Sequence, residues 1–215
     1  IICVKEGKVI SWGGGFGFED NEFITPVSLA YSNLSLFVLD QSQSKLTEFD
    51  SNLNLVRSFV LDINYPELIL FNHLNETIIF SNSEHALFRY RFDFRAEETV
   101  IDINQYPQIS GDIVNIYISK NGAIGLLTAN PDVVFLFNLS GRYSRSVIPL
   151  IDDPKWLFTV SGRWIVFNGS GSYYFLDPSE DIHSVPIHNI HFMIEKNSIL
   201  YALSSEGYYK LYLKE

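Results

Sequence analysis

The chain has 215 residues, of which 47% are hydrophobic and 19% are charged, and its formal net charge is −10 with an isoelectric point near 4.9. This length and apolar content predict one globular domain with a single core. The acidic balance argues against a nucleic-acid partner, because the densest basic stretch is only RYRFDFR. The apolar runs are far shorter than the roughly 20 residues that a membrane-spanning helix needs, so no membrane span is expected.

The first segment, IICVKEGKVISWGG, has two short apolar runs around a Glu-Gly turn and is predicted to be a β-hairpin. It holds Cys3, the only cysteine, so neither an internal disulfide nor a cysteine-rich metal site is expected. The next stretch, GGGFGFED from Gly13, lacks the spacing of a phosphate-binding loop and the βαβ context of a dinucleotide fingerprint. We expect it to be a flexible crossover that can fold over the mouth of a channel.

Five similar segments follow along the chain. Each has a strand-like run, a turn, a strongly apolar run and a third aromatic or β-branched run, and four of the five continue into a fourth. The strongly apolar runs are LFVLD, TIIFSN, AIGLLTA, WIVFNG and ILYALS, which start at residues 36, 77, 123, 164 and 199. Their starts are therefore 41, 46, 41 and 35 residues apart, which is the sequence signature of a repeat architecture.

Four strands recurring about every 40 residues are the unit of a β-propeller blade. The sequence therefore predicts an all-β, five-bladed β-propeller with four antiparallel strands per blade, in which residues 1–215 form a single domain. The predicted blades span about 24–62, 66–104, 112–150, 154–188 and 190–215. The last blade lacks a fourth strand, and we expect residues 1–13 to complete it, with one or both strands of the hairpin, and so to cover an open sheet edge. An irregular β-sandwich is the rival fold.

The stretch ITPVSLAYSN followed by LFVLDQSQSKLTEFDSNLNLVRSF resembles an NHL-type repeat of the β-propeller superfamily. Pro26 precedes the inner strand, LFVLD is similar to an LYVAD-like second strand, and KLTEFDSNL is similar to an I-x-x-FD-x-x-G third strand. The resemblance is clear over residues 24–59 and faint elsewhere, where only the spacing and the apolar pattern remain. It implies a propeller that docks protein, sugar, peptide or RNA, but the basic face of the RNA-binding members is not evident in this acidic chain.

Carboxylates on the inner strands raise the hypothesis of a glycosidase, in which one acid and one base or nucleophile face each other across the channel. Glu67 and Glu195 lie on predicted inner strands, with Asp112 and Asp153 at strand starts. Such enzymes generally have longer loops and more acidic residues at the channel. Catalysis is therefore the weaker hypothesis, and no catalytic residue is assigned.

Histidines gather in HSVPIHNIH, which holds His183, His188 and His191. Their spacing fits neither the i, i+4 pair of a helical zinc motif nor one side of a strand, so no metal and no cofactor is expected. Four N-x-S/T sequons favour a periplasmic or secreted location only slightly, because Asn is common at turns anyway. They begin at Asn33, Asn75, Asn138 and Asn168.

Aromatic side chains are the predicted binding residues, because such rings are enriched at recognition surfaces. The candidates are Trp12, Trp156, Trp164, Tyr173 and Tyr208. The main hypothesis is a non-catalytic interaction or scaffold module whose partner is another protein. A sugar-binding, lectin-like propeller is the alternative, although the loops share little beyond Ser and Asn.

Overall fold

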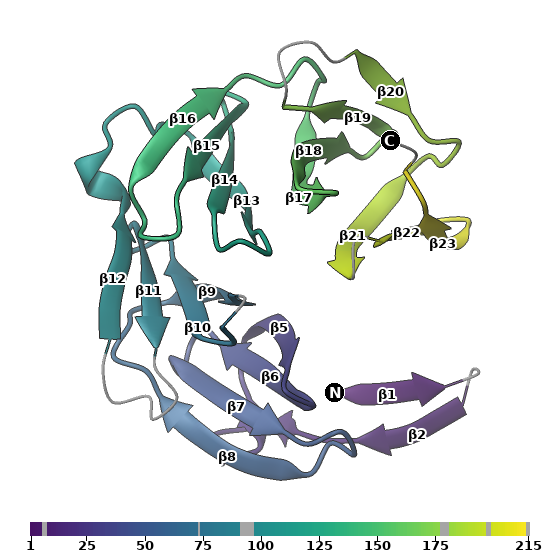
Figure 1. Cartoon of the computed structure of the whole chain (residues 1–215). Coiled ribbons are helices and arrows are strands. Elements are labelled where there is room, and N and C mark those ends of the chain that lie inside the picture. Colours follow the sequence, from purple (N-terminus) through teal and green to yellow (C-terminus); the bar gives the residue numbers. More distant parts are fainter. Residues whose placement is uncertain (6–7, 73, 91–96, 177–180, 197–198, 214–215) are drawn as a thin grey trace. The chain divides into compact units, whose positions relative to one another are not determined.

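The computed structural model describes residues 1–5, 8–72, 74–90, 97–176, 181–196 and 199–213 (Figure 1). The chain divides into two compact units, Ile1–Tyr106 and Pro107–Glu215. Apart from the 3₁₀ turn η1 (Ile103–Gln105), the regular structure of the described residues consists of β-strands. None of their helices is both long enough and apolar enough to cross a bilayer.

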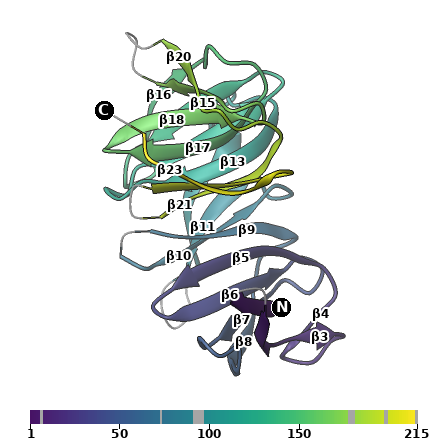
Figure 2. The ribbon, with the colours of Figure 1, turned by 90° about the vertical axis from the view of Figure 1, so that its right-hand side faces the viewer.

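The first unit contains two antiparallel four-stranded sheets, in which strands that follow each other in sequence are neighbours. One sheet is β5 (Pro26–Ser32), β6 (Ser35–Asp40), β7 (Lys45–Phe49) and β8 (Leu55–Val60). The other is β9 (Pro66–Phe71), β10 (Thr77–Ser81), β11 (Ala86–Tyr90) and β12 (Glu97–Asp102). The unit begins with the hairpin of β1 (Ile2–Lys5) and β2 (Lys8–Trp12), and the short parallel pair of β3 (Gly15–Phe16) and β4 (Glu22–Phe23) follows (Figure 2).

The second unit contains three antiparallel sheets with the same consecutive order. The first is β13 (Asp112–Ile118), β14 (Ile124–Ala129), β15 (Val133–Phe137) and β16 (Tyr143–Val147). The next is β17 (Pro154–Val160), β18 (Arg163–Asn168), β19 (Ser172–Phe175) and β20 (Ile182–Ser184). The last is β21 (Ile190–Lys196), β22 (Ile199–Ser204) and β23 (Gly207–Leu211).

These sheets confirm the predicted all-β, five-bladed propeller with antiparallel sheets, four of which have four strands among the described residues. Among the described residues, β1 pairs with β2 and the last sheet has three strands. Completion of that sheet by residues 1–13, and the assignment of residues 1–215 to one domain, stay predictions.

Two of the middle strands, β7 and β10, are buried on both faces. Every residue of β7 and β10 is buried. Their faces pack against neighbouring parts of the protein, and strands of the same sheet lie on both edges. In the first unit, Leu39 and Leu46 pack in one cluster with Ile69 and Ile79 of the next sheet. Stacking of blades therefore forms the core within each unit.

Four tight hairpins share one local signature, in which Phe is followed by Asp or Asn: FDSNLN, FNHLNE, FNLSGR and FNGSGS. In each turn, Oδ1 of this Asp or Asn accepts the backbone N–H groups two and four residues later. The accepting residues are Asp50, Asn72, Asn138 and Asn168. The residue three positions after each of them has a positive φ, at Leu53, Asn75, Gly141 and Gly171. Asx side chains favour such turns because they bond the nearby backbone, so the Asn of two sequons is explained by turn geometry.

The Gly-rich segment expected to be a flexible crossover is instead bonded to the first sheet. Lys45 is buried, and its Nζ donates to the backbone oxygens of Glu19 (2.8 Å) and Glu22 (2.5 Å). Asp40 is also fully buried and accepts the N–H groups of Ile24 (2.6 Å) and Thr25 (3.0 Å). A buried Asp and a buried Lys on one hairpin therefore fix the loop that leads into the first blade.

Candidate interaction sites

A cavity of about 820 Å³ lies within the second unit. It is bordered by the loop before β17, the β18–β19 turn, the start of β21 and the β22–β23 turn. We call it the loop cavity. Its apolar lining is Leu150, Ile151, Ile182 and Ile190, and its polar lining includes Asp152, Asp153, Lys155, Asn168, Ser170, Asn189, His191 and Ser205.

The loops around this cavity are held by hydrogen bonds rather than by side-chain packing alone. The Asn168 side-chain amide donates to the backbone oxygen of Asp152 at 3.0 Å, and the Ile190 N–H donates to the backbone oxygen of Gly169 at 2.9 Å. A ring nitrogen of His188 lies 3.1 Å from the backbone oxygen of Ser170. Backbone bonds of this kind tie the cavity walls to the strands, so the cavity is largely pre-formed.

The cavity offers several charged or ionisable groups to a ligand. Lys155 Nζ lies 3.2 Å from Asp153 Oδ2, and both side chains are exposed. Within the part of the chain that the structure describes, neither the Asp152 carboxylate nor the His191 imidazole has a hydrogen-bond or ion-pair partner. These groups can therefore bond a ligand without first breaking an internal contact.

A second polar cluster connects inner strands of the three sheets in the second unit. The Tyr117 hydroxyl of β13 donates to Glu195 Oε2 of β21 at 2.8 Å, and Lys120 Nζ lies 3.9 Å from Glu195 Oε1. Burial, partly offset by a hydrogen bond with Thr159, raises the pKa of Tyr117 well above its ordinary value. Both oxygens of Glu195 therefore face protein groups, and its side chain is only 9% exposed.

Beside this cluster is a smaller cavity of about 220 Å³, lined by Ser119, Lys120, Asn121, Thr159, Ser161, Gly162 and Trp164. The Trp164 ring meets the Tyr117 ring edge to face at 6.0 Å. Tyr117 therefore contacts both Trp164, a predicted binding residue that lines this cavity, and Glu195, a predicted carboxylate.

The other predicted carboxylates occupy separate places. Glu67 lies on β9 of the first unit, where burial raises its pKa. Asp112 begins β13 and is exposed, and Asp153 lines the loop cavity. Pairing of Glu67 with Glu195 as an acid and a base stays a prediction.

The predicted aromatic residues differ strongly in exposure. Trp12 at the end of β2 is 75% exposed and Tyr208 on β23 is 68% exposed, whereas Trp156 is 9% exposed and belongs to the core. Tyr173 is half-buried between the Phe167 and His183 rings, with centroid distances of 5.0 and 5.2 Å. Only Trp12 and Tyr208 thus present most of their surface to solvent, and a binding role for each of the five residues stays a prediction.

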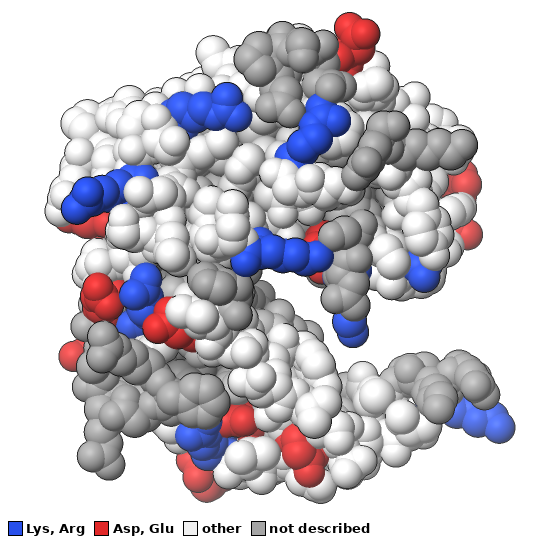
Figure 3. Space-filling model, viewed as in Figure 1, with Lys and Arg blue, Asp and Glu red and all other residues white. Residues whose placement is uncertain are grey.

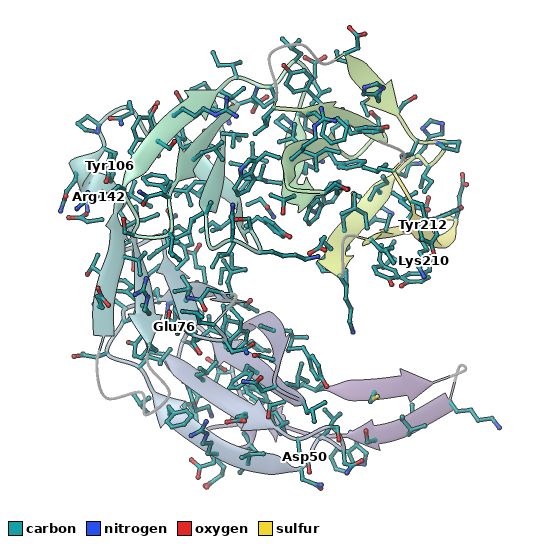
Figure 4. The ribbon with its side chains drawn as sticks, viewed as in Figure 1. Asp50, Glu76, Tyr106, Arg142, Lys210 and Tyr212 are labelled. Carbon is teal, nitrogen blue, oxygen red and sulfur yellow. The ribbon has the colours of Figure 1, made fainter. Side chains whose placement is uncertain are left out.

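Tyr208 belongs to an aromatic face on the last sheet. Its ring stacks on that of Tyr201 at 5.8 Å, and Lys210 Nζ lies 5.9 Å from the Tyr201 ring and 5.1 Å from the Tyr212 ring. Figure 4 shows Lys210 and Tyr212 next to each other at this end of the chain. Phe192, Leu203 and Tyr208 are aligned across the three strands and are all largely exposed.

The three histidines have different surroundings. His183 stacks on Tyr173, His188 contacts the Ser170 backbone, and His191 lines the loop cavity. Within the described ranges, no three His, Cys, Asp or Glu side chains are placed to hold a metal ion. On the face drawn in Figure 3, the blue Lys and Arg side chains are scattered and do not gather in one patch.

Sequence reasoning did not select Phe16 and Phe18 as binding residues, although they are 83% and 81% exposed. It treated their segment as a connection because no nucleotide motif was present. It also did not select Asp152 or His191, whose place in the loop cavity depends on contacts between residues distant in sequence. The FGF triplet was a usable signal, because two Phe separated by Gly lie in a segment too short to form a long buried strand.

Comparison with solved structures shows that the similar proteins are β-propellers. Virginiamycin B lyase from Staphylococcus aureus matches with a TM-score of 0.60 and 11% identity, over 87% of this chain and 69% of that chain. YCF48 bound to a D1 peptide matches with a TM-score of 0.57 and 11% identity, over 84% and 60%. BamB from Moraxella catarrhalis matches with a TM-score of 0.54 and 14% identity, over 95% and 63%.

No protein-family model matches the chain. No curated protein sequence matches it either. At 11–14% identity for these three neighbours, the likeness establishes the propeller fold and leaves the activity open. The finer assignment to the NHL type stays a prediction.

Proposed function

We propose that this protein is a non-catalytic interaction module that binds a polypeptide segment in the loop cavity. The observation that carries the proposal is the 820 Å³ cavity itself, which combines an apolar lining with unpartnered Asp152 and His191 side chains on backbone-anchored loops. Rigid sheets that present short loops are a common way to build a binding surface.

A polypeptide suits this lining better than a neutral sugar does. The cavity presents two carboxylates, an ammonium group and an imidazole, and charged side chains of a peptide can pair with these groups. Isoleucines in the lining offer contact to apolar side chains. One structural neighbour, YCF48, is seen bound to a peptide, which shows that this fold can hold such a ligand.

Selection of peptides from a random 12-residue phage library against the full chain tests the proposal. Selected peptides should lose affinity for the Asp152→Ala variant and for the Ser205→Trp variant, whose Trp fills the cavity. They should keep their affinity for the Lys120→Ala variant, because Lys120 lines the other cavity. Binders that are insensitive to both cavity variants, or a failure to select any binder, would contradict it.

A glycosidase is the second candidate function, and the contact between Tyr117 and Glu195 is the observation that bears on it. A catalytic carboxylate must reach substrate, but both Glu195 oxygens face protein groups. A structural role for Glu195 is therefore favoured. Turnover of any glycan in a panel by the unaltered protein, abolished in Glu195→Gln and in Glu67→Gln, would support catalysis instead; binding of glycans without turnover would support the lectin alternative.

We also infer that residues 1–13 complete the last blade and close a five-bladed ring. The outer edge of β23 has no partner strand among the described residues, and unpaired edges are usually covered. The aligned apolar row of Phe192, Leu203 and Tyr208 is the kind of face that a neighbouring blade covers. Both features favour pairing of residues 1–13 with the open edge of β23.

Cysteine pairs test this closure. In a Cys3→Ala background, one cysteine at Val9 or Ile10 and one at Tyr208 or Lys210 should form a disulfide under mild oxidation, because paired strands bring Cα atoms to about 5.5 Å. A pair with Val60→Cys, on the exposed edge strand β8, is the control that should stay reduced. Equal cross-linking of all pairs, or none with β23, would count against closure.

A further inference from the structure

The loop that joins the N-terminal hairpin to the first sheet exposes two phenylalanines. Phe16 is 83% exposed and Phe18 is 81% exposed. They are separated by Gly17, and they follow Trp12, which is 75% exposed. Single exposed apolar residues are common on protein surfaces, but aromatic rings gathered in one short segment mark interaction sites.

The backbone of this loop is held firmly. The Gly15 N–H donates to the backbone oxygen of Asn21 at 3.0 Å, and the Gly17 N–H donates to that of Phe23 at 3.3 Å. Two side chains from the β6–β7 hairpin add further bonds. Gln43 donates to the Gly17 backbone oxygen and Thr47 to the Asp20 backbone oxygen, both at 3.3 Å. The buried Lys45 ammonium holds two more carbonyls of the same loop.

Two glycine positions show that the loop is closely fitted. A Cβ on Gly17 would lie 2.0 Å from a Glu22 carboxylate oxygen, and a Cβ on Gly14 would lie 2.6 Å from the Phe23 ring. Both glycines also have positive φ. The positive φ favours glycine at both positions, and at Gly14 the Phe23 ring also leaves no room for a side chain, so the two Phe side chains are displayed from a pre-organised frame.

Charge around the two rings is negative. Glu19 and Asp20 are exposed beside them, and Glu22 uses one carboxylate oxygen to accept the Glu19 N–H at 3.1 Å. The first unit, residues 1–106, has seven Lys and Arg against fifteen Asp and Glu, a net charge of −8, whereas residues 107–215 have eight against ten, a net charge of −2. Long-range attraction therefore favours a partner that presents positive charge to this loop.

We propose that Phe16 and Phe18 form an anchor that inserts into an apolar groove of another protein, where Lys or Arg side chains on the rim of the groove face Glu19 and Asp20. Rigid aromatic anchors surrounded by a polar rim dominate the affinity of many protein interfaces. A lipid surface fits the loop poorly, because the acidic side chains beside the rings are repelled by anionic headgroups. This contact is separate from the loop cavity of the second unit and needs no ligand there.

A synthetic pair of two-helix hairpins provides a defined probe. Both hairpins have the same Leu-lined groove, which is bordered by Lys in one and by Glu in the other, and their binding to the full chain is measured by fluorescence anisotropy. The Lys-bordered hairpin should bind at least about tenfold more tightly than the Glu-bordered one. The double variant Phe16→Ser, Phe18→Ser should weaken that binding by about tenfold or more, and Glu19→Lys with Asp20→Lys should reverse the preference between hairpins.

The control is the double variant Leu34→Ser, Val60→Ser, which removes two exposed apolar side chains of the same unit from other places. It should bind the Lys-bordered hairpin like the unaltered chain, and the urea unfolding midpoint of the Phe variant should be unchanged because both rings are exposed.

Absence of binding, equal affinity for both hairpins, or an equal loss in the control variant would overturn the proposal. Phe-dependent binding to phosphatidylcholine–phosphatidylserine vesicles would also overturn it, in favour of a membrane contact. Peptides selected in the loop cavity should bind the Phe variant normally, so failure of either proposal leaves the other intact.

Discussion

Replacement of Asp40 by Asn should sharply destabilise the first unit, although the two side chains have nearly the same shape. Asp40 ends β6, is fully buried, and accepts five hydrogen bonds. Oδ2 accepts the Ile24 and Thr25 N–H groups and the Gln43 side-chain amide, and Oδ1 accepts the Ser42 hydroxyl and the Gln43 N–H. An Asn side chain has only one oxygen, so at least two of these donors lose their acceptor.

The size of the effect follows from those donors. A buried donor left without a partner costs about 1–3 kcal/mol, and a hydrogen bond to a charged group contributes about 1.5–3 kcal/mol. Two lost bonds therefore predict a decrease of about 3 kcal/mol or more in the free energy of unfolding, a large share of the roughly 5–15 kcal/mol typical of a domain. Asp40 also attracts the buried Lys45 ammonium, which loses that support in the variant.

Urea unfolding followed by circular dichroism, with hydrogen exchange of the peptides covering β6 to β8, measures the change. Asp50→Asn is the matched control, because an Asn already occupies the equivalent turn position at Asn72, Asn138 and Asn168, and it should change the free energy of unfolding by less than about 0.5 kcal/mol. A similarly small change in Asp40→Asn would refute the reasoning.

The same substitution should also alter the acid sensitivity of the first unit. Burial raises the pKa of Asp40, but hydrogen bonds from Gln43, Ile24, Thr25 and Ser42 outweigh burial and hold it below the ordinary value of 3.8. The charged carboxylate therefore contributes its full stability above that ordinary pKa, and this contribution is lost as the pH falls through the lower pKa of the folded state. Between neutral pH and pH 2, the unaltered protein should lose more stability than Asp40→Asn does; equal losses would contradict this assignment.

Four further substitutions test local features of the fold by urea unfolding. Leu34→Gly should stabilise the first unit by about 1 kcal/mol, because Leu34 is 75% exposed and has a φ of 67° that glycine adopts without strain. Leu53→Gly should instead destabilise it by about 1 kcal/mol or more, since Leu53 has a similar φ but is buried. Tyr117→Phe should destabilise the second unit by about 1–2 kcal/mol, because the nearly buried Glu195 loses a donor. Gly125→Ala should cost about 1–3 kcal/mol, because its Cβ would lie within 3.0 Å of side-chain atoms of the next sheet.

The fold could be predicted because spacing and apolar pattern survive where residue identity does not. The five strongly apolar runs of the sequence lie on or overlap β6, β10, β14, β18 and β22, the second strand of each sheet. Most residues of β6, β10, β14 and β18 are buried, so almost any large apolar residue suits them and no exact motif is needed. The pairing of the first and last strands could not be fixed in this way, because edge strands are short and carry weak patterns.

The candidate sites were much harder to predict than the fold. Aromatic content alone did not separate Trp156, which fills the core, from Tyr208, which is exposed, because both occupy strand positions. Asp152 and His191 lie 39 residues apart, and only the packing of neighbouring sheets brings them to one cavity. Glu195 was selected as a carboxylate on an inner strand, but its bond from Tyr117 depends on a contact across 78 residues. Contacts of such range leave no local signal in a sequence.

The Asp that ends the second strand of the first sheet has a role that recurs in other sheets with different residues. Asp40 bonds the backbone before β5, Ser81 at the end of β10 donates to the Asn64 oxygen before β9 at 2.6 Å, and Asn168 at the end of β18 donates to the Asp152 oxygen before β17. In each case a polar side chain at the end of the second strand holds the loop that leads into the same sheet. A position defined by its hydrogen bonds tolerates Asp, Ser or Asn, so the same loop contact persists in sheets whose sequences differ.

This shared role also connects the fold to both proposed contacts. Asp40 anchors the end of the loop that displays Phe16 and Phe18, and Asn168 anchors the loop that places Asp152 in the cavity. Loosening either anchor should therefore weaken the corresponding contact while leaving the other unchanged. Asn168→Ala should reduce the affinity of cavity-selected peptides and leave binding of the Lys-bordered hairpin intact. If both bindings fell together, the two loops would not be independent binding elements, and the separate roles assigned to the two units would be wrong.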